Sequence, residues 1–199
     1  MEWSAAVLCG GASRRMGTDK ALVTVDGVPM LRRVAVALRR AGAGHVACVG
    51  SGTPADDARR RGALAGLGVV AVADDHPGEG PLGGILTALR TAPDDVDVVL
   101  VVACDLLTPT PSALAATVAA LADPDAGADP GTGHDVAVPH GRQWLHAAWH
   151  RRVLPTLTAR FAAGERAVHR AVEGLTVAAV DVDPAACRDA DTPDDLPSP

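Results

Sequence analysis

Short runs of consecutive apolar residues alternate along the chain with segments in which apolar residues recur every three or four positions. Such runs, bounded by glycine and polar residues, are typical of buried strands, and the longer spacing is typical of amphipathic helices. Strands are therefore predicted over residues 3–8, 45–49, 69–73, 96–103 and 177–182, and helices over 29–41, 55–64, 85–91, 111–121, 153–163 and around Val168. Strands that alternate with helices predict a parallel sheet with right-handed crossovers.

The most apolar run, residues 96–103, is expected to be a central parallel strand buried on both faces. Residues 136–139 and 145–149 flank the turn His140-Gly-Arg142 and predict an antiparallel hairpin. Residues 21–27 predict an extended piece with a turn. Residues 123–134 predict a loop rich in Asp, Gly and Pro, and residues 192–196 a capped helical turn. We find no internal repeat and expect one domain over residues 1–199.

The composition narrows the classes of function. The formal charge of −6 argues against a general nucleic-acid or membrane-surface binder. No apolar stretch approaches the roughly 20 residues that span a bilayer, and the N-terminus lacks a secretory pattern, so we expect a cytoplasmic protein with no membrane or nucleic-acid partner. The four cysteines show no Cys-x-x-Cys spacing and are expected to be reduced thiols. The seven histidines show no metal-ligand spacing.

The segment that carries most of the candidate chemistry is residues 8–20, Leu-Cys-Gly-Gly-Ala-Ser-Arg-Arg-Met-Gly-Thr-Asp-Lys, which follows the first predicted strand. Its glycines allow positive φ and a close approach of backbone N–H groups to an anion. Arg14, Arg15 and Lys20 add cationic donors suited to phosphate. Lys20 is the only lysine among 18 basic residues, which suggests that arginine would not serve at this position.

This segment does not fit the common phosphate loops. A P-loop requires Gly-Lys-Ser/Thr, whereas Lys20 follows Asp19 and precedes Ala21. A dinucleotide fingerprint requires Gly-x-Gly-x-x-Gly, which Gly10-Gly11 does not match. The segment resembles instead the signature Leu-x-Gly-Gly-x-Ser-x-Arg-Met-Gly-x-Asp-Lys of the small nucleotidyltransferases, and within them it is similar to the molybdenum cofactor guanylyltransferase (MobA) family.

Two aspartates follow predicted strands on the side where ligands bind in open parallel sheets. Asp74 comes after residues 69–73 and Asp105 after residues 96–103, so both are expected to converge with the glycine-rich segment. Proteins usually hold Mg²⁺ with one or two carboxylates together with oxygens of the substrate phosphates. Asp105 is therefore the candidate metal ligand, and a hydrogen bond within the following turn is the alternative.

The resemblance implies a fold, a metal and a set of nucleotide-binding residues. The fold would be α/β, three-layer αβα, with a mostly parallel Rossmann-like sheet and a small antiparallel hairpin. Residues 1–110 would form the nucleotide-binding half and 111–199 the acceptor-binding half. The metal would be Mg²⁺, with Mn²⁺ as the alternative. The nucleotide-binding residues would be Leu8, Cys9, Gly10, Gly11, Ser13, Arg15, Lys20, Asp74, Gly80, Pro81, Leu82, Gly84 and Asp105, with Arg15, Lys20 and Asp105 catalytic. Asp74 is preferred to Asp75 as the nucleotide-binding residue, because it comes first after the predicted strand.

The resemblance is looser in the last third of the chain. Arg142 and Arg166 lie in turns similar to those the family uses for the pterin, while Trp144-Leu145 stands where the family often has His-Pro. Trp144 would either stack on a pterin or fill a gap in the core. The family's Asn-x-Asn-Thr-Pro corresponds here to Asp189-Ala-Asp191-Thr-Pro, and a carboxylate accepts hydrogen bonds but cannot donate as an amide does.

The function that the resemblance implies is transfer of GMP from GTP to molybdopterin or its molybdenum form. Other molybdenum cofactor biosynthesis proteins and the acceptor molybdoenzyme would be further partners. Two related alternatives are a CTP-dependent cytidylyltransferase acting on the same pterin and a transferase for another phosphorylated acceptor. A GTP-binding regulatory protein without turnover is an alternative from another class, and a dehydrogenase is disfavoured by the glycine spacing.

Overall fold

The structure is a computed structural model that describes residues 2–10, 19–122, 133–140, 143–190 and 192–196. The strands are β1 (Ser4–Leu8), β2 (Thr24–Val25), β3 (Val28–Pro29), β4 (His45–Val49), β5 (Val69–Val72), β6 (Val98–Ala103), β7 (Val136–Pro139), β8 (His146–His150) and β9 (Val177–Val180). The α-helices are α1 (Met30–Arg40), α2 (Pro54–Ala63), α3 (Pro81–Thr91), α4 (Pro111–Ala122), α5 (Leu154–Ala162) and α6 (Val168–Ala171). Short 3₁₀ helices are η1 (Lys20–Leu22), η2 (Arg151–Val153), η3 (Pro184–Cys187) and η4 (Pro193–Asp195).

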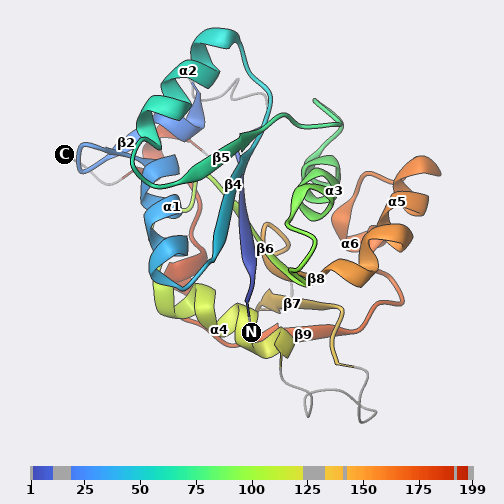
Figure 1. The fold of residues 1–199 in the computed structure, drawn as a ribbon. Coiled ribbons are helices and arrows are strands. Elements are labelled where there is room, and N and C mark those ends of the chain that lie inside the picture. The colour runs from blue at the N-terminus through green and yellow to red at the C-terminus, as the bar shows by residue number, and fades with distance from the viewer. Residues whose placement is uncertain (1, 11–18, 123–132, 141–142, 191, 197–199) are drawn as a thin grey trace.

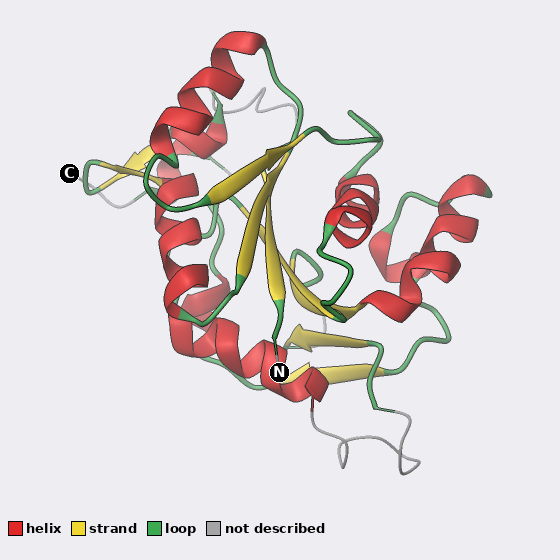
Figure 2. Cartoon of the chain, in the orientation of Figure 1, coloured by secondary structure: helices red, strands yellow, loops and turns green. Residues whose placement is uncertain are grey.

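A seven-stranded sheet forms the middle layer, in the order β5-β4-β1-β6-β8-β7-β9 (Figures 1 and 2). Strands β5, β4, β1 and β6 are parallel, β8 is antiparallel to both of its neighbours, and β9 is parallel to β7. Leu8 at the end of β1 is in register with Val49 on one side and Ala103 on the other. The carboxyl ends of β4, β1 and β6 therefore lie together at one edge. This arrangement confirms the predicted α/β fold, with β7 and β8 as the predicted antiparallel pair inside the main sheet.

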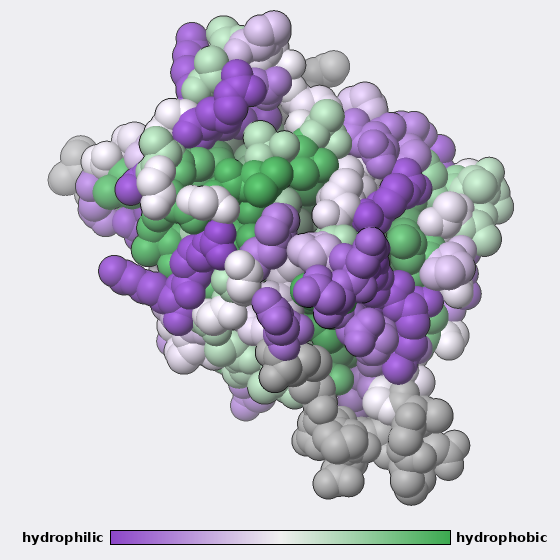
Figure 3. Space-filling model, viewed as in Figure 1, coloured by the Kyte–Doolittle hydropathy of each residue, from purple (hydrophilic) through white to green (hydrophobic). Residues whose placement is uncertain are grey.

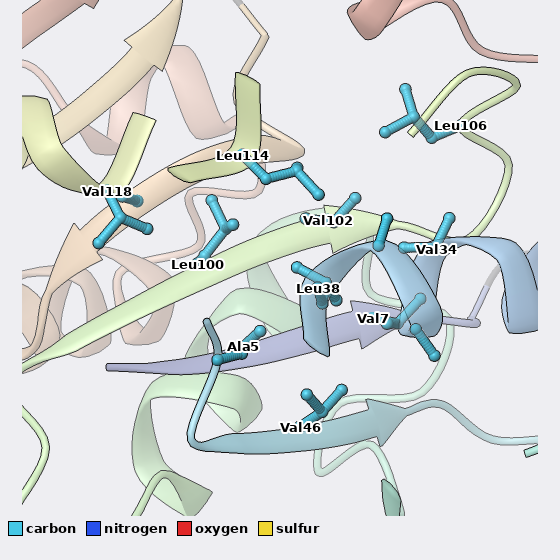
Figure 4. Close-up of a cluster of buried hydrophobic side chains, with 14 of the residues drawn as sticks. Ala5, Val7, Val34, Leu38, Val46, Leu100, Val102, Leu106, Leu114 and Val118 are labelled. Carbon is cyan, nitrogen blue, oxygen red and sulfur yellow. The ribbon is translucent and has the colours of Figure 1, made fainter. Parts of the chain in front are cut away.

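The two faces of the sheet are covered by different helices, α1 and α4 on one side and α3, α5 and α6 on the other (Figure 1). The alternation of side chains along β1 puts Ala5 and Val7 into the first core, with Leu38 and Leu114 (Figure 4), and Ala6 and Leu8 into the second. All six residues of β6 are buried, which confirms it as the predicted central apolar strand.

The structure corrects several predicted boundaries. Helix α3 begins at Pro81 rather than Ile85, because Gly80 with φ 88° precedes a proline in the first helical position. Residues 21 and 22 of the predicted extended piece belong to η1, because Asp19 caps that turn, and β2 follows at Thr24. The predicted loop at 123–134 lies outside the described residues except for Gly133 and His134. None of the helices among the described residues is long and apolar enough to cross a membrane.

Candidate functional site

The carboxyl edge of β1, β4 and β5 brings two predicted segments, at Gly10 and Asp74, together with the turn at Gly50. A Cβ added to Gly10 would lie 3.7 Å from Asp74 Oδ2 and 4.0 Å from Gly50 Cα. A Cβ on Gly50 would lie 2.9 Å from the carbonyl carbon of Cys9. The turn after β4 therefore requires glycine to lie against the end of β1, a close approach that the sequence analysis missed. Of the predicted loop residues, Gly11, Ser13 and Arg15 lie outside the described residues.

The central contact of the site is an ion pair between Lys20 and Asp105. Lys20 Nζ lies 2.5 Å from Asp105 Oδ2, and their side chains are 19% and 15% exposed. Asp105 lies just after the end of β6. The residue before it, Cys104, donates its backbone N–H to the Leu8 carbonyl at the end of the neighbouring strand β1. The two residues predicted to handle phosphate and metal are 85 positions apart in the sequence and in direct contact in the fold.

The two aspartates after β5 point in different directions. Asp74 Oδ1 accepts hydrogen bonds from His76 N–H and from Thr87 Oγ1, at 3.0 and 3.1 Å. Its Oδ2 faces Gly10, as described above. Asp75 instead pairs with Arg90 at 2.8 Å on the surface. This geometry favours Asp74 over Asp75 as the residue nearest to the glycine-rich segment.

The second glycine cluster positions α3 rather than presenting side chains to a ligand. Gly80 and Pro81 are exposed at the helix start, whereas Leu82 is fully buried in the second core. Gly84 lies against Leu8, because an added Cβ would be 3.3 Å from both of its terminal methyl carbons. Leu82 and Gly84, predicted to bind nucleotide, thus pack α3 onto β1, and the exposed part of this segment is Gly80-Pro81.

Replacing Gly83 with alanine is expected to destabilise the fold by about 1–3 kcal/mol. The added Cβ would lie 2.7 Å from His76 Cβ and 3.3 Å from the His76 carbonyl oxygen. Gly62→Ala is the matched control, because a Cβ on this α2 glycine meets nothing within 4 Å and alanine stabilises a helix by about 0.5–1 kcal/mol. Denaturant unfolding of both variants checks this, and a Gly83→Ala protein as stable as wild type would contradict it.

Two of the four predicted acceptor residues, Asp189 and Arg166, lie within the described part of the chain; Arg142 and Asp191 do not. Asp189 lies beside the ion pair, since the Ala190 N–H donates to the Asp105 carbonyl at 3.0 Å. Arg166 lies by α3, where its guanidinium pairs with Glu79 at 2.6 Å and stacks 3.8 Å from the Phe161 ring centroid. Trp144 packs against the second core, which favours its role as a core-filling side chain.

A buried histidine to which the sequence analysis gave no specific role, His146, contacts Asp189. His146 Nε2 lies 2.9 Å from Asp189 Oδ1, and the His146 side chain is 2% exposed. Strand β8 positions it, with His146 in register with Val102 of β6. The only sequence signal was a histidine within an apolar strand, and its partner is 43 residues away.

The four cysteines are free and buried in the structure. Cys9, at the start of the glycine-rich segment, lies with its Sγ 3.1 Å from Cys48 Sγ. A hydrogen bond with Cys104, another with Cys48 and burial raise the pKa of the Cys9 thiol, which therefore stays protonated near neutral pH.

A cavity of about 690 Å³ lies between α2 and the edge strand β5, beside the site. Its lining includes the Gly50-Ser-Gly52 turn, Arg60 and Val72. The surface over β5 is apolar in Figure 3, and Val70 of this strand is 48% exposed. The cavity therefore joins a glycine turn and cationic side chains to an apolar wall.

Comparison with known proteins gives a family match over most of the chain. A MobA-like NTP transferase domain model matches residues 5–180. A probable molybdenum cofactor guanylyltransferase from Methanothermobacter thermautotrophicus is 32% identical over 97% of this chain and 96% of its own length. A molybdenum cofactor guanylyltransferase from Rhodobacter capsulatus is 33% identical over 98% and 94%. One from Xanthomonas euvesicatoria is 40% identical, but over 50% of this chain and 45% of its own length.

Solved structures agree on the fold. Molybdopterin-guanine dinucleotide biosynthesis protein A from Archaeoglobus fulgidus aligns with a TM-score of 0.74 at 23% identity, over 97% of this chain and 94% of the other. A nucleotidyl transferase from the same Methanothermobacter species aligns with a TM-score of 0.76 at 19% identity, over 98% and 94%. Because the family model spans most of the chain and two relatives above 30% identity align over nearly its full length, this chain belongs to the MobA-like NTP transferase family.

Proposed function

We propose that this chain transfers GMP from GTP to the phosphate of molybdopterin or its molybdenum form, giving the guanine dinucleotide cofactor and pyrophosphate. The relatives aligned over nearly the whole chain carry the guanylyltransferase name. The observation that carries the proposal is the ion pair at the carboxyl edge of the sheet between Lys20, the last residue of the glycine-rich segment, and Asp105.

The reaction requires little covalent chemistry from the protein. An oxygen of the acceptor phosphate attacks the α-phosphorus of GTP in line, and the bond from that phosphorus to the bridging oxygen of the β-phosphate breaks. Pyrophosphate leaves with the electron pair. Catalysis of such a step is mostly positioning and neutralisation of charge. Lys20 is assigned to the phosphates, with Arg15 of the glycine-rich segment.

The residues present fit a magnesium ion held mainly by substrate. No group of three His, Cys, Asp or Glu side chains with metal-binding geometry occurs among the described residues. Asp105 supplies one carboxylate that is 15% exposed at the strand edge, and Mg²⁺ commonly takes one or two carboxylates plus phosphate oxygens. When bound there, Mg²⁺, or Mn²⁺ as the alternative, would neutralise phosphate charge.

We assign choice of base to Asp74 and to the exposed Gly80-Pro81 at the start of α3. Asp74 Oδ1 already accepts from His76 N–H and from Thr87 Oγ1. Its Oδ2 is therefore the oxygen assigned to a donor of the base, such as N1–H or N2–H of guanine or the amino group of cytosine. Asp74 Oδ2 faces Gly10, and the exposed Gly80 lies on the following loop. The preference for GTP over CTP rests on the guanylyltransferase names of the relatives that align over nearly the whole chain.

Purified protein with Mg²⁺ and molybdopterin, or its molybdenum form, is expected to release pyrophosphate with GTP and not with CTP. The measurement is coupled pyrophosphate detection with the two nucleotides in parallel, and omission of the pterin is the control. Release with CTP alone would make the chain a cytidylyltransferase. Binding of GTP without release would contradict the proposed acceptor and favour a binding protein.

A further inference from the structure

Helix α2 is an exposed, polar helix whose one buried residue is an arginine. Its sequence is Pro-Ala-Asp-Asp-Ala-Arg-Arg-Arg-Gly-Ala, and Arg60 is 8% exposed. Burial of a guanidinium is unfavourable unless the charge is paired and hydrogen-bonded. Because Arg60 is buried, its guanidinium requires a specific partner of opposite charge inside the fold.

The partner is Asp19, the residue before Lys20. Arg60 Nε donates to Asp19 Oδ2 at 2.7 Å, and the two side chains are 10% and 9% exposed. The other oxygen of the same carboxylate accepts from the Ala21 N–H at 3.1 Å and caps η1. One carboxylate thus joins α2 to the 3₁₀ turn that begins with Lys20.

The guanidinium is itself held by the glycine turn after β4. Cβ atoms added to Gly50 and Gly52 would lie 3.2 and 3.5 Å from Arg60 Nη1. Asp57 Oδ1 lies 3.8 Å from the same nitrogen. Burial lowers the pKa of Arg60, while the hydrogen bond and charge of Asp19 raise it above its usual value, so the guanidinium is charged across the working pH range.

We propose that Arg60 is a positioning residue that acts through Asp19 to hold Lys20 against Asp105 and the nucleotide phosphates. Arg60 pairs with Asp19. Asp19 caps η1, whose first residue is Lys20, and the Lys20 ammonium pairs with Asp105. The inference rests on the proposed nucleotidyl transfer for its kinetic consequence. A shift of about 1 Å in a charged group can cost about 100-fold in rate, so a remote anchor of this kind controls turnover.

The test compares Arg60→Met, which keeps the apolar stem, with Arg60→Lys, which keeps a charge that can reach Asp19. We expect Arg60→Met to lower kcat for pyrophosphate release about 10- to 100-fold, and Arg60→Lys to recover most of the loss. Arg59→Met is the matched control, since Arg59 on the same helix is 66% exposed. All assays are run well below each variant's measured unfolding midpoint.

Asp19→Asn tests the same contact from its other end and serves if Arg60→Met does not fold. The amide keeps an oxygen to cap Ala21 but loses the charge that Arg60 faces. Its kcat is expected to fall as for Arg60→Met, and the double variant to be no slower than the slower single one. Additive losses in the double variant would overturn the inference, as would a normal kcat in both single variants.

Amide hydrogen exchange gives a second measurement that does not depend on turnover. Exchange over residues 20–22 is expected to be faster in Arg60→Met and Asp19→Asn and unchanged in Arg59→Met. Unchanged exchange there would overturn the inference whether or not wild type is active. Wild-type protein without pyrophosphate release would instead overturn the proposed function, and faster exchange with an undiminished kcat would reduce Arg60 to a structural role.

Discussion

Replacing Asp105 with asparagine is expected to lower kcat for pyrophosphate release by about 10²- to 10³-fold, the cost typical of losing one charge-stabilising group at a reacting centre. The carboxylate forms an ion pair with Lys20. Asparagine preserves the size of the side chain but supplies no negative charge to hold a divalent cation. The change also removes the negative charge of Asp105 from the Lys20 ammonium.

The Asp105→Asn experiment needs a second measurement, because loss of the pair also affects stability. Mn²⁺ binding in the presence of GTP, followed by electron paramagnetic resonance, should weaken together with kcat, while the denaturant midpoint reports folding. Asp94→Asn is the control, since Asp94 is fully exposed at the other end of β6. Normal kcat in a folded Asp105→Asn protein would remove Asp105 from the catalytic assignment.

The fold was predictable because its elements are encoded locally. The uninterrupted apolar run of β6 indicates a strand buried on both faces, and the helical spacing from Met30 to Leu38 indicates α1; the structure has both. The errors fall at turns. Pro81 starts α3 four residues earlier than the apolar spacing suggested, because proline after a glycine with positive φ begins a helix regardless of which later residues are apolar.

The positions of Asp74 beside Gly10 and of Asp105 beside Lys20 were also predictable, since the carboxyl ends of parallel strands share one edge of the sheet. Arg60 and His146 were not. Each makes its decisive contact with a residue 41 or more positions away, and each lies in an element whose own pattern is ordinary: a polar helix and an apolar strand. Pairing of buried polar side chains is a property of the assembled fold, and periodicity along the chain does not encode it.

Replacing Lys20 with methionine is expected to lower kcat by about 10²- to 10³-fold, and replacing it with arginine to recover little of that loss. The Lys20 and Asp105 side chains are 19% and 15% exposed, and Nζ lies 2.5 Å from Asp105 Oδ2. Lysine presents a compact point charge there, whereas the guanidinium of arginine is larger, planar and directional in its donors. Retention of one lysine in a chain with 17 arginines agrees with this requirement.

Steady-state pyrophosphate release by Lys20→Met and Lys20→Arg, with denaturant unfolding of each, tests the requirement for lysine. Arg59→Lys exchanges the same two residue types at an exposed position and should leave kcat unchanged. If Lys20→Arg were as active as wild type, any cation would serve, and the single lysine would reflect codon usage alone. If Lys20→Arg stays inactive but folded, shape as well as charge is required, because the planar guanidinium cannot replace the compact ammonium against Asp105 and the phosphates.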